Sequence, residues 1–447
     1  MKRETQQTTA FVLSFMRLLL VATAILPLLM AHSLFFPYIS GKVFFLRFSV
    51  TLVAILFTFR FIQKPSFREE MREKLNRLLK DGLFLSVLAY FIIFVLTAIP
   101  AVNWYWAFYG SIERGEGVVG MLFFFGFFLF SVLLFRDKDW LLFFKIGLGV
   151  AIILFFDAMK QYLNGVNRPA SYAGHPIYLG VYFLFVIFSS WIIYFSTERD
   201  DLFWRLCSVL IVPFCLVGIL IAEARGAMVG IAAGSLATTV YLAIYGKDEK
   251  WKTFTLRQIA CFLLVGLVLS GSLFLTTREN PFWQKIPGID RLARISMKDS
   301  TTVSRLLTAK VAIRSVDPRE GNIEKFFLGW GPENFLVAWN QYFDPEIFQH
   351  DSASLDRAHN KLLDVMVMNG IFGLLSYLAV WICAFKLTFS KGMPVPCQSA
   401  LLFFGISYFV QNLFVFDSVV TYIPFFAYLS FLIFISSKDY PNVAKAK

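Results

Sequence analysis

Long apolar runs recur along the whole chain and constrain its fold more than any other feature of the sequence. Each run has about 17–25 residues, the length that a helix needs to cross roughly 30 Å of hydrocarbon. The runs are continuously apolar and lack the alternation of a membrane β-barrel. We therefore expect an all-α, polytopic membrane protein with about twelve transmembrane helices. The expected spans are 10–31, 43–62, 81–98, 118–135, 140–157, 177–195, 203–222, 226–245, 257–275, 369–389, 399–416 and 420–436.

The composition agrees with this class. Of the 447 residues, 57% are hydrophobic and 16% are charged, against about 45–50% and about 25% in soluble domains. The first run follows Lys2 and Arg3, as in a signal peptide, but it is too long and eleven more follow, so we interpret it as a retained anchor. The net charge of +12 needs no nucleic-acid partner, because anionic lipid headgroups attract basic loops.

Basic residues in the loops predict the orientation. With the N-terminus placed in the cytoplasm, the cytoplasmic segment from Arg60 to Lys80 alone holds seven Lys and Arg. The short loops on the other side hold Lys42, Arg114, Lys160, Arg168 and Arg225. We therefore expect both termini to be cytoplasmic. The five cysteines lie in runs or on the cytoplasmic side and predict neither a disulfide framework nor a metal site.

One outer loop is far longer than the others. Residues 276–358 separate the ninth and tenth runs, and the chain divides into a transmembrane bundle over 1–275, this loop subdomain, and a second bundle part over 359–447. The loop is rich in aromatic residues, and its periodicity predicts helices over 301–315 and 333–343. Its first half is strongly basic and its second half acidic. A basic lip beside a membrane favours an anionic headgroup or a phosphate, although a solvated face with internal salt bridges fits the same charges.

Two arginines are the strongest candidates for binding a phosphate. Arg225 lies in a very short connection at the membrane edge, where charged residues are commonly paired or functional, and Glu223 is a candidate partner. Gly226 follows it and favours close helix packing. Arg305 begins the helical stretch in the basic half of the loop, and its guanidinium offers a fork of donors suited to phosphate oxygens.

A second group of candidates lies in two loop motifs and one short loop. His359 precedes a membrane helix, and histidine is the side chain most readily poised as a general base near neutral pH. The glycines of a GxGxxxF turn permit close approach of the backbone to a ligand. The further candidates for substrate contacts are Arg168, His175, Gly329, Gly331, Glu333, Arg357 and Asn360. Each of these residues also has an ordinary structural interpretation.

Common catalytic signatures are absent from the sequence. We find no Walker loop, zinc-ligand spacing, Rossmann fingerprint or Ser-His-Asp order. The cytoplasmic loops are too short to form a nucleotide-sugar domain. The candidate polar residues instead gather at the outer membrane interface, whereas transporters tend to place ionisable residues at the bilayer midplane and to carry inverted repeats. We therefore favour an enzyme over a transporter.

Taken together, these motifs resemble the O-antigen ligase and O-antigen polymerase superfamily. The resemblance rests on the Arg225-Gly226 pair, the Arg305 helix, the turn from Gly329 to Phe335, and His359-Asn360 followed by a GxxG at Gly370 and Gly373. They occur in the order typical of the family, within and beside its large outer loop. In motif terms the resemblance covers about residues 165–390, and the twelve spans extend it to the whole chain.

The resemblance implies a GT-C-like glycosyltransferase of the bacterial inner membrane, with its active site at the periplasmic face. Its donor would be an undecaprenyl-pyrophosphate-linked glycan, bound through Arg225 and Arg305. His359 would take a proton from the acceptor hydroxyl as that hydroxyl attacks C1 of the sugar, with inversion. The family implies no metal and no cofactor, because the arginines supply the charge.

The acceptor remains open between three interpretations. It is lipid A–core oligosaccharide for an O-antigen ligase, a second lipid-linked repeat for a polymerase, and a protein Ser or Thr for a protein O-oligosaccharyltransferase. The last group usually has a further outer domain near its C-terminus, whereas only residues 439–447 follow the last run. The His-Asn pair and the single large loop are more typical of ligases, so we favour the ligase.

Overall fold

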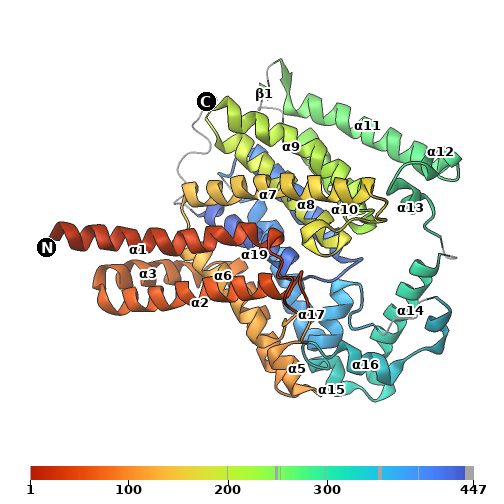
Figure 1. Ribbon diagram of the computed structural model, residues 1–447, viewed down its shortest axis with the longest axis horizontal. Coiled ribbons are helices and arrows are strands. Elements are labelled where there is room, and N and C mark those ends of the chain that lie inside the picture. The colour runs from red at the N-terminus through yellow and green to blue at the C-terminus, as the bar shows by residue number, and fades with distance from the viewer. Residues whose placement is uncertain are drawn as a thin grey trace.

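The computed structural model describes residues 2–198, 200–246, 250–251, 253–296, 299–350, 355–390 and 392–437, with the backbone alone for residues 2–10, 250 and 251. Apart from the short antiparallel pair β1 (Lys250–Trp251) and β2 (Phe254–Thr255), the regular elements of these residues are helices (Figure 1). This confirms the expected all-α class. The cytoplasmic C-terminal tail of our topology, after Ser437, lies outside the described residues.

Every predicted apolar run forms a helix, but fewer helices qualify as spans than expected. Within the described residues, nine are long and apolar enough to cross a membrane, or ten if one bent pair is counted, not twelve. The nine are α1 (Lys2–Ala22) with η1 (Thr23–Leu28), α2 (Ser40–Gln63), α7 (Asp137–Leu163), α8 (Pro176–Ser196), α9 (Leu202–Ile221), α10 (Arg225–Tyr245), α11 (Leu256–Thr277), α17 (Lys361–Thr388) and α19 (Val419–Ser436).

The other three runs fall short for physical reasons. Helix α4 (Gly82–Ala98) has 17 residues and is bent by 89° from α3 (Pro65–Leu78). Helix α6 (Val118–Leu134) also has 17 residues, which cover only about 25 Å at 1.5 Å per residue. Helix α18 (Val395–Asn412) is long enough, but Gln398, Gln411 and Asn412 make it more polar.

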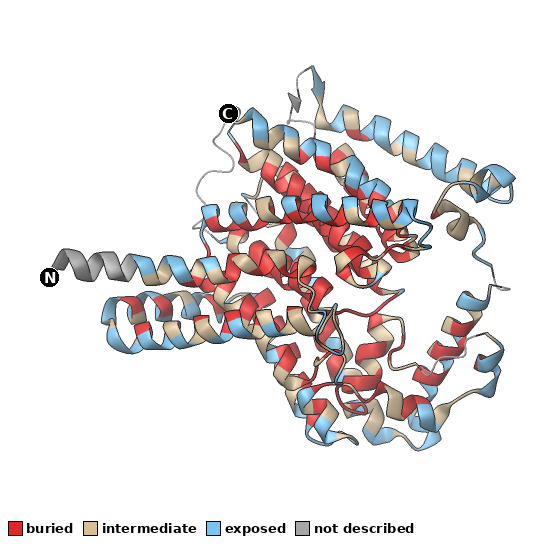
Figure 2. Cartoon of the chain, in the orientation of Figure 1, coloured by how far each residue is buried: buried red, intermediate tan, exposed pale blue. Residues whose placement is uncertain are grey.

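The centre of the bundle is formed by α8 and α19. In their apolar windows 83% and 89% of the residues are buried inside the protein, against 6% in α11 (Figure 2). Helix α11 packs mainly on α10, α10 packs closely on α18, and α17 packs on α4. Because α11 buries so few of its apolar side chains within the protein, its surface suits contact with lipid.

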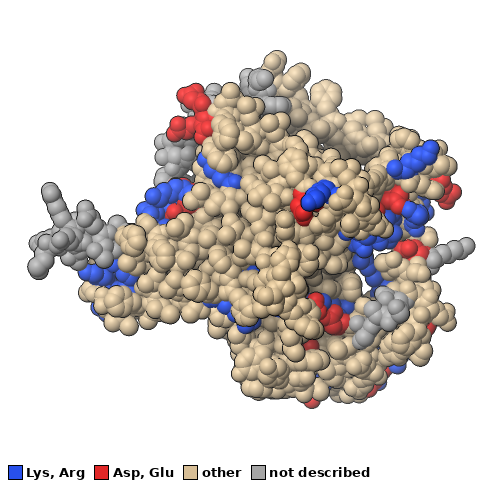
Figure 3. Space-filling view, viewed as in Figure 1, with Lys and Arg blue, Asp and Glu red and all other residues tan. Residues whose placement is uncertain are grey.

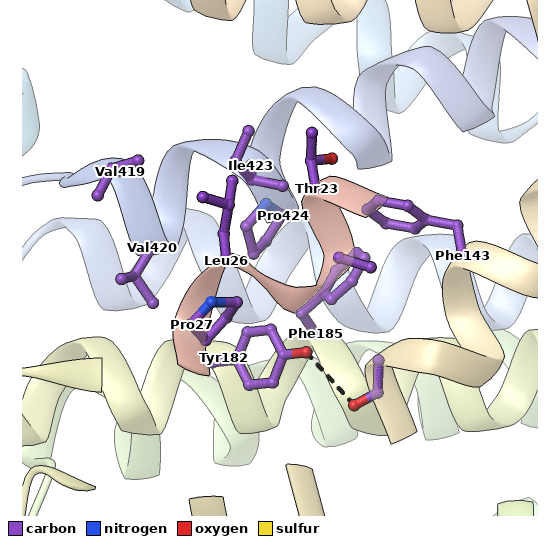
Figure 4. Close-up of a pocket in the computed structure, with 12 residues that line it drawn as sticks. Thr23, Leu26, Pro27, Phe143, Tyr182, Phe185, Val419, Val420, Ile423 and Pro424 are labelled. Atoms are coloured by element: carbon purple, nitrogen blue, oxygen red, sulfur yellow. Dashed lines mark hydrogen bonds between the residues drawn. The ribbon is translucent and has the colours of Figure 1, made fainter. Parts of the chain in front are cut away.

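Packing at the centre leaves one small apolar cavity between η1, α7, α8 and α19 (Figure 4). Pro27 and Pro424 face it, and the Tyr182 hydroxyl donates a hydrogen bond to the Gly147 carbonyl at 3.3 Å. Its volume is about 10 Å³, at the lower limit for one water molecule. This space is therefore a packing defect and not a ligand site.

The long loop folds into short helices around its own apolar core. It contains α12 (Pro281–Gln284), α13 (Ile289–Ala293), α14 (Ser300–Arg314), η4 (Pro318–Glu320), α15 (Ile323–Leu328), α16 (Phe335–Tyr342) and η5 (Pro345–Gln349). Helices α14 and α16 confirm the two predicted helices. The core joins Val311, Trp330, Phe335 and Trp339 to Met368 of α17. With α5 (Trp104–Tyr109), the helices α14–α16 form a lobe at one end of the bundle (Figure 1).

Candidate functional site

A cavity of about 420 Å³ lies between this lobe and the bundle. Its walls come from the start of α10, from α14, from the turn before α17, and from the end of α18. Figure 3 shows basic side chains in a hollow on this side of the molecule, between the α11–α13 segment and the α14 lobe. The polar lining residues are Arg225, Thr301, Thr302, Arg305, His359 and Asn360. The three residues predicted to carry the chemistry therefore share one cavity.

Arg225 is held at the first position of α10. The preceding turn places Glu223 at a φ of +50°, and a side chain at Gly230 or Gly234 would collide with α18, so small residues let α10 approach it closely. The Arg225 guanidinium lies 3.1 Å from the Asp299 carboxylate. The expected pairing with Glu223 was wrong, because Glu223 instead lies 3.6 Å from Arg291 of α13.

Asp299 is the carboxylate that orients Arg225. Burial by itself would raise its pKa, but hydrogen bonds from Thr302 and Arg225 hold that pKa below the usual value. Asp299 therefore remains ionised and fixes the guanidinium at the edge of the cavity. One nitrogen of Arg225, Nε, is buried without a hydrogen-bond partner among the described residues, so the side chain retains a donor for a ligand.

Arg305 projects from α14 toward the same cavity. Burial lowers the pKa of its guanidinium, and the neighbouring charges of Arg225, Arg291 and Arg168 lower it further. In the described part of the chain no carboxylate forms an ion pair with Arg305. An arginine stays protonated under these conditions, so its charge is uncompensated and an anion bound beside it would be stabilised.

Arg168 and Arg291 complete a group of four arginines with Arg225 and Arg305, which we call the arginine cluster. Burial lowers the pKa of Arg168 and of Arg291, and both also feel the charge of Arg225. Two of the four are matched, Arg225 by Asp299 and Arg291 by Glu223. Arg168 and Arg305 have no ion pair within the described residues, which leaves about two positive charges at the site.

His359 lines the same cavity as Arg225 and Arg305. Its Nδ1 lies 3.3 Å from the Arg357 carbonyl oxygen. Since a carbonyl only accepts, Nδ1 carries the proton of the neutral ring and Nε2 keeps its lone pair. Burial lowers the pKa of His359, and the charge of Arg305 lowers it further. The imidazole is therefore largely neutral at pH 7 and able to accept a proton.

The other candidates in the histidine region hold helix ends in place. The Asn360 side chain caps α17 by accepting from the backbone N–H groups of Leu362 and Leu363 at 3.0 and 3.2 Å, and it also lines the cavity. His175 caps α8 in the same way, with Nδ1 accepting from the Ile177 N–H at 3.2 Å. Burial lowers the pKa of His175 to about 4, helped by the charges of Arg168 and His359. Unlike Asn360, His175 does not line the cavity.

Arg357 and Glu333 are placed differently from the expectation of a substrate contact. They pair with each other in a buried network, where the Arg357 guanidinium also lies 3.2 Å from Glu116 and 3.4 Å from Asp364. The side chains of Arg357 and Glu333 are 6% and 5% exposed. Burial raises the pKa of Glu116 to about 8, against the lowering influence of Arg357. This network fixes the turn that carries His359.

Gly329 and Gly331 also serve packing and do not line the cavity. Gly331 and the intervening Trp330 donate hydrogen bonds to the carbonyls of Met368 and Val367, at 2.9 and 2.8 Å. These carbonyls are free to accept hydrogen bonds from outside the helix, because α17 is interrupted at Gly370, which has a φ of +64°. A side chain at Gly329 would meet the backbone of Met368. The GxGxxxF turn therefore docks the loop onto the break in α17.

Backbone strain concentrates around the cavity and its support. Non-glycine residues with positive φ are uncommon, and they cluster at functional sites where the surrounding structure fixes them. Within the described residues there are five. They are Arg168, Ser171, Glu223, Glu333 and His359. Three of these flank or belong to the cationic site, which is consistent with a geometry set for binding.

Some residues of the site were not identified from the sequence. In the sequence, nothing distinguishes Arg291 and Asp299 from the other charges of the basic half-loop, and no motif marks Glu116. Glu116 and Arg357 are separated by 241 positions, so no local pattern joins them. An excess of arginine in a loop after a membrane helix was the one available signal for Arg291.

The fold and the cavity define a class of protein: a polytopic membrane protein with a cationic, histidine-containing cavity at one end of its bundle. Residues 209–378 match the family model described as O-Antigen ligase, so this segment is similar to that family. The matched segment includes Arg225, Arg305 and His359. No curated protein matches the chain. The family match supports an activity of the O-antigen ligase or polymerase type.

Proposed function

We propose that this protein is an O-antigen ligase, a metal-independent inverting glycosyltransferase. It moves a glycan from undecaprenyl pyrophosphate to a lipid A–core acceptor at the periplasmic face of the bacterial inner membrane. The observation that carries the proposal is the meeting of Arg225, Arg305 and His359 around one cavity. The matched family fits a ligase and a polymerase alike, and our preference for the ligase rests on the His359-Asn360 pair and the single large loop of the sequence.

The charge of the site suits the donor. A diphosphate that links a polyprenyl chain to a sugar carries two negative charges, and Arg168 and Arg305 leave about two positive charges without ion-pair partners. When the bond from C1 to the diphosphate oxygen breaks, the leaving group gains a further negative charge. Fixed guanidinium groups in a site that is partly shielded from water stabilise such a developing charge strongly.

The acceptor hydroxyl meets a base on the other side of the cavity. In the proposed step, its oxygen forms the new bond to C1 while its proton passes to Nε2 of His359. The electron pair of the broken bond leaves with the diphosphate. The hydrogen bond from Nδ1 to the Arg357 carbonyl orients the ring for this transfer, and it strengthens as the imidazolium forms.

The cavity lining supports a single displacement. A retaining glycosyl transfer commonly uses a carboxylate nucleophile to form a covalent intermediate. Among the described residues that line the cavity, none is Asp or Glu, and the nearby Asp299 is engaged by Arg225 and Thr302. Direct attack by the acceptor from the face opposite the diphosphate inverts the anomeric centre.

Reconstitution tests the function. The purified protein in nanodiscs is given a lipid-diphosphate-linked glycan, with lipid A–core in one arm and without it in the other. The proposal predicts glycan on lipid A, and loss of this product in His359→Ala and Arg305→Ala at unchanged protein level. Elongation of the lipid-linked glycan in both arms would identify a polymerase instead. Full transfer by both variants would remove the proposed mechanism.

A further inference from the structure

A second cavity, of about 360 Å³, lies at the opposite end of the bundle from the arginine cluster. Helix α6 begins beside Glu116, α19 begins beside Asp417 near the same network, and both run away from the site. Their C-terminal ends reach this cavity, where they meet α3 and the start of α7. The lining residues are Lys74, Arg77, Leu78, Val132, Phe135, Arg136, Asp137, Ile433, Phe434 and Ser437.

This cavity, which we call the α3 cavity, combines basic groups with apolar walls. Lys74, Arg77 and Arg136 contribute three positive charges against the one carboxylate of Asp137, so its lining has a net charge of +2. A purely structural pocket in a bundle would be apolar, and a solvated surface would lack the apolar walls. The basic groups and the apolar walls together match an amphiphile with an anionic head.

The ion pairs of Lys74 and Arg136 are weak. The Lys74 ammonium donates to the Leu133 carbonyl at 3.1 Å, which fixes it at the C-terminal end of α6. Its ion pair with Glu70 is 35% and 56% exposed, and Arg136 lies 3.6 Å from Asp139 with half of its side chain exposed. Exposed ion pairs of this kind are worth little and are readily exchanged. An anionic ligand could therefore accept hydrogen bonds from Lys74 and Arg136 in place of these ion pairs.

The placement of the cavity points to a lipid and not to a free anion. Helix α3 is bent by 89° from α4 and runs back beside α2, one of the candidate membrane spans (Figure 1). It buries Phe67, Met71 and Leu78 and exposes its charged face. The cavity lies where α6 and α19 end, and basic pockets between membrane helices bind anionic headgroups.

We propose that the α3 cavity binds an anionic phospholipid. Lys74, Arg77 and Arg136 contact its phosphate, and its acyl chains pack against the apolar walls that include Phe135 and Ile433. A lipid in this position connects α3 to the α6–α7 turn and to the end of α19. It stabilises the bend between α3 and α4 independently of glycan transfer.

The test uses the full chain in nanodiscs and counts bound lipid by native mass spectrometry. Wild type is expected to retain phosphatidylglycerol in preference to phosphatidylcholine. The double variant Lys74→Gln/Arg136→Gln is expected to lose about thirtyfold in affinity (about 2 kcal/mol), since each basic residue at an anionic surface contributes roughly 1 kcal/mol. Arg72→Gln, a matched change on the exposed face of α3, should alter the affinity less than about twofold.

Two controls keep the outcome interpretable. The double variant should melt at the wild-type temperature in phosphatidylcholine nanodiscs, and Lys74→Arg/Arg136→Lys should retain the preference. Equal retention of both lipids by wild type, or an equal loss in Arg72→Gln, would overturn the proposal. Displacement of the lipid by millimolar inorganic phosphate would also overturn it, because the site would then recognise phosphate without acyl chains.

Discussion

Replacement of Arg305 by alanine gives the sharpest separation of charge from structure at the site. Arg305 lines the cavity and has no ion pair within the described residues, so its removal takes away a cation that is free to face the diphosphate. Loss of one fixed donor to a developing anion typically costs roughly 10²–10³ in kcat. We expect a loss of this size in transfer kinetics measured with purified protein in nanodiscs.

The same change should move the pH profile. Arg305 contributes to the low pKa of His359, after burial, and only the neutral imidazole accepts the acceptor's proton. Activity therefore falls as the pH drops through the pKa of His359. Removing the positive charge raises that pKa, so the acid limb of the profile should shift to higher pH in Arg305→Ala. Arg305→Lys keeps the positive charge but loses the paired donors of the guanidinium. This variant should have a lower kcat, with little shift in the acid limb of the pH profile.

Lys310 provides the matched control for this experiment. It lies on the same helix, but it is 56% exposed and pairs with Asp344 at 2.9 Å, away from the cavity. Lys310→Ala should therefore leave kcat within about twofold of wild type. A wild-type kcat in Arg305→Ala would contradict a role of this cation in transfer, and so would an acid limb that coincides with that of wild type while the rate falls.

Three further predictions concern the supporting structure. Glu116 has a pKa of about 8 in the folded state, above the ordinary glutamate value of 4.5. Between these two values the folded protein holds a proton that the unfolded chain releases, so the free energy of unfolding should decline as the pH rises from about 5 to 8. Glu116→Gln should flatten this decline, measured by thermal unfolding across the pH range. Arg357→Met should lower stability by roughly 3–5 kcal/mol, because it leaves buried carboxylates unpaired, and a wild-type melting temperature would contradict the network. Gly370→Ala should cost roughly 1–3 kcal/mol more than Gly165→Ala, since both have positive φ but only at Gly370 would the new methyl meet neighbouring backbone; equal melting temperatures would contradict this.

The apolar runs were sufficient to place the helices. Each of the twelve formed one, because a continuous run of this length has few alternatives in a membrane. The number of spans was less accurate, since hydropathy does not reveal the 89° bend after α3 or the shortness of α6. Length and polarity at the ends of a run decide whether a helix crosses, and both are uncertain in a single sequence.

The candidate site was predicted in part. The motifs predicted that Arg225, Arg305 and His359 share one site, and the structure places all three around one cavity. Contacts between distant segments were not predictable. Arg357 was expected to contact substrate beside His359, yet it is buried against Glu116. Charged residues near a site therefore divide into ligand-facing and supporting groups only when their partners are known.

The most direct test of the central claim is a cryo-EM structure of the protein in a nanodisc with undecaprenyl diphosphate, the expected leaving group. The account predicts both phosphates within hydrogen-bonding distance of Arg225 and Arg305, with His359 across the cavity on the side left for the acceptor. Density for the diphosphate elsewhere on the protein, or with His359 on the same side as the lipid, would contradict it.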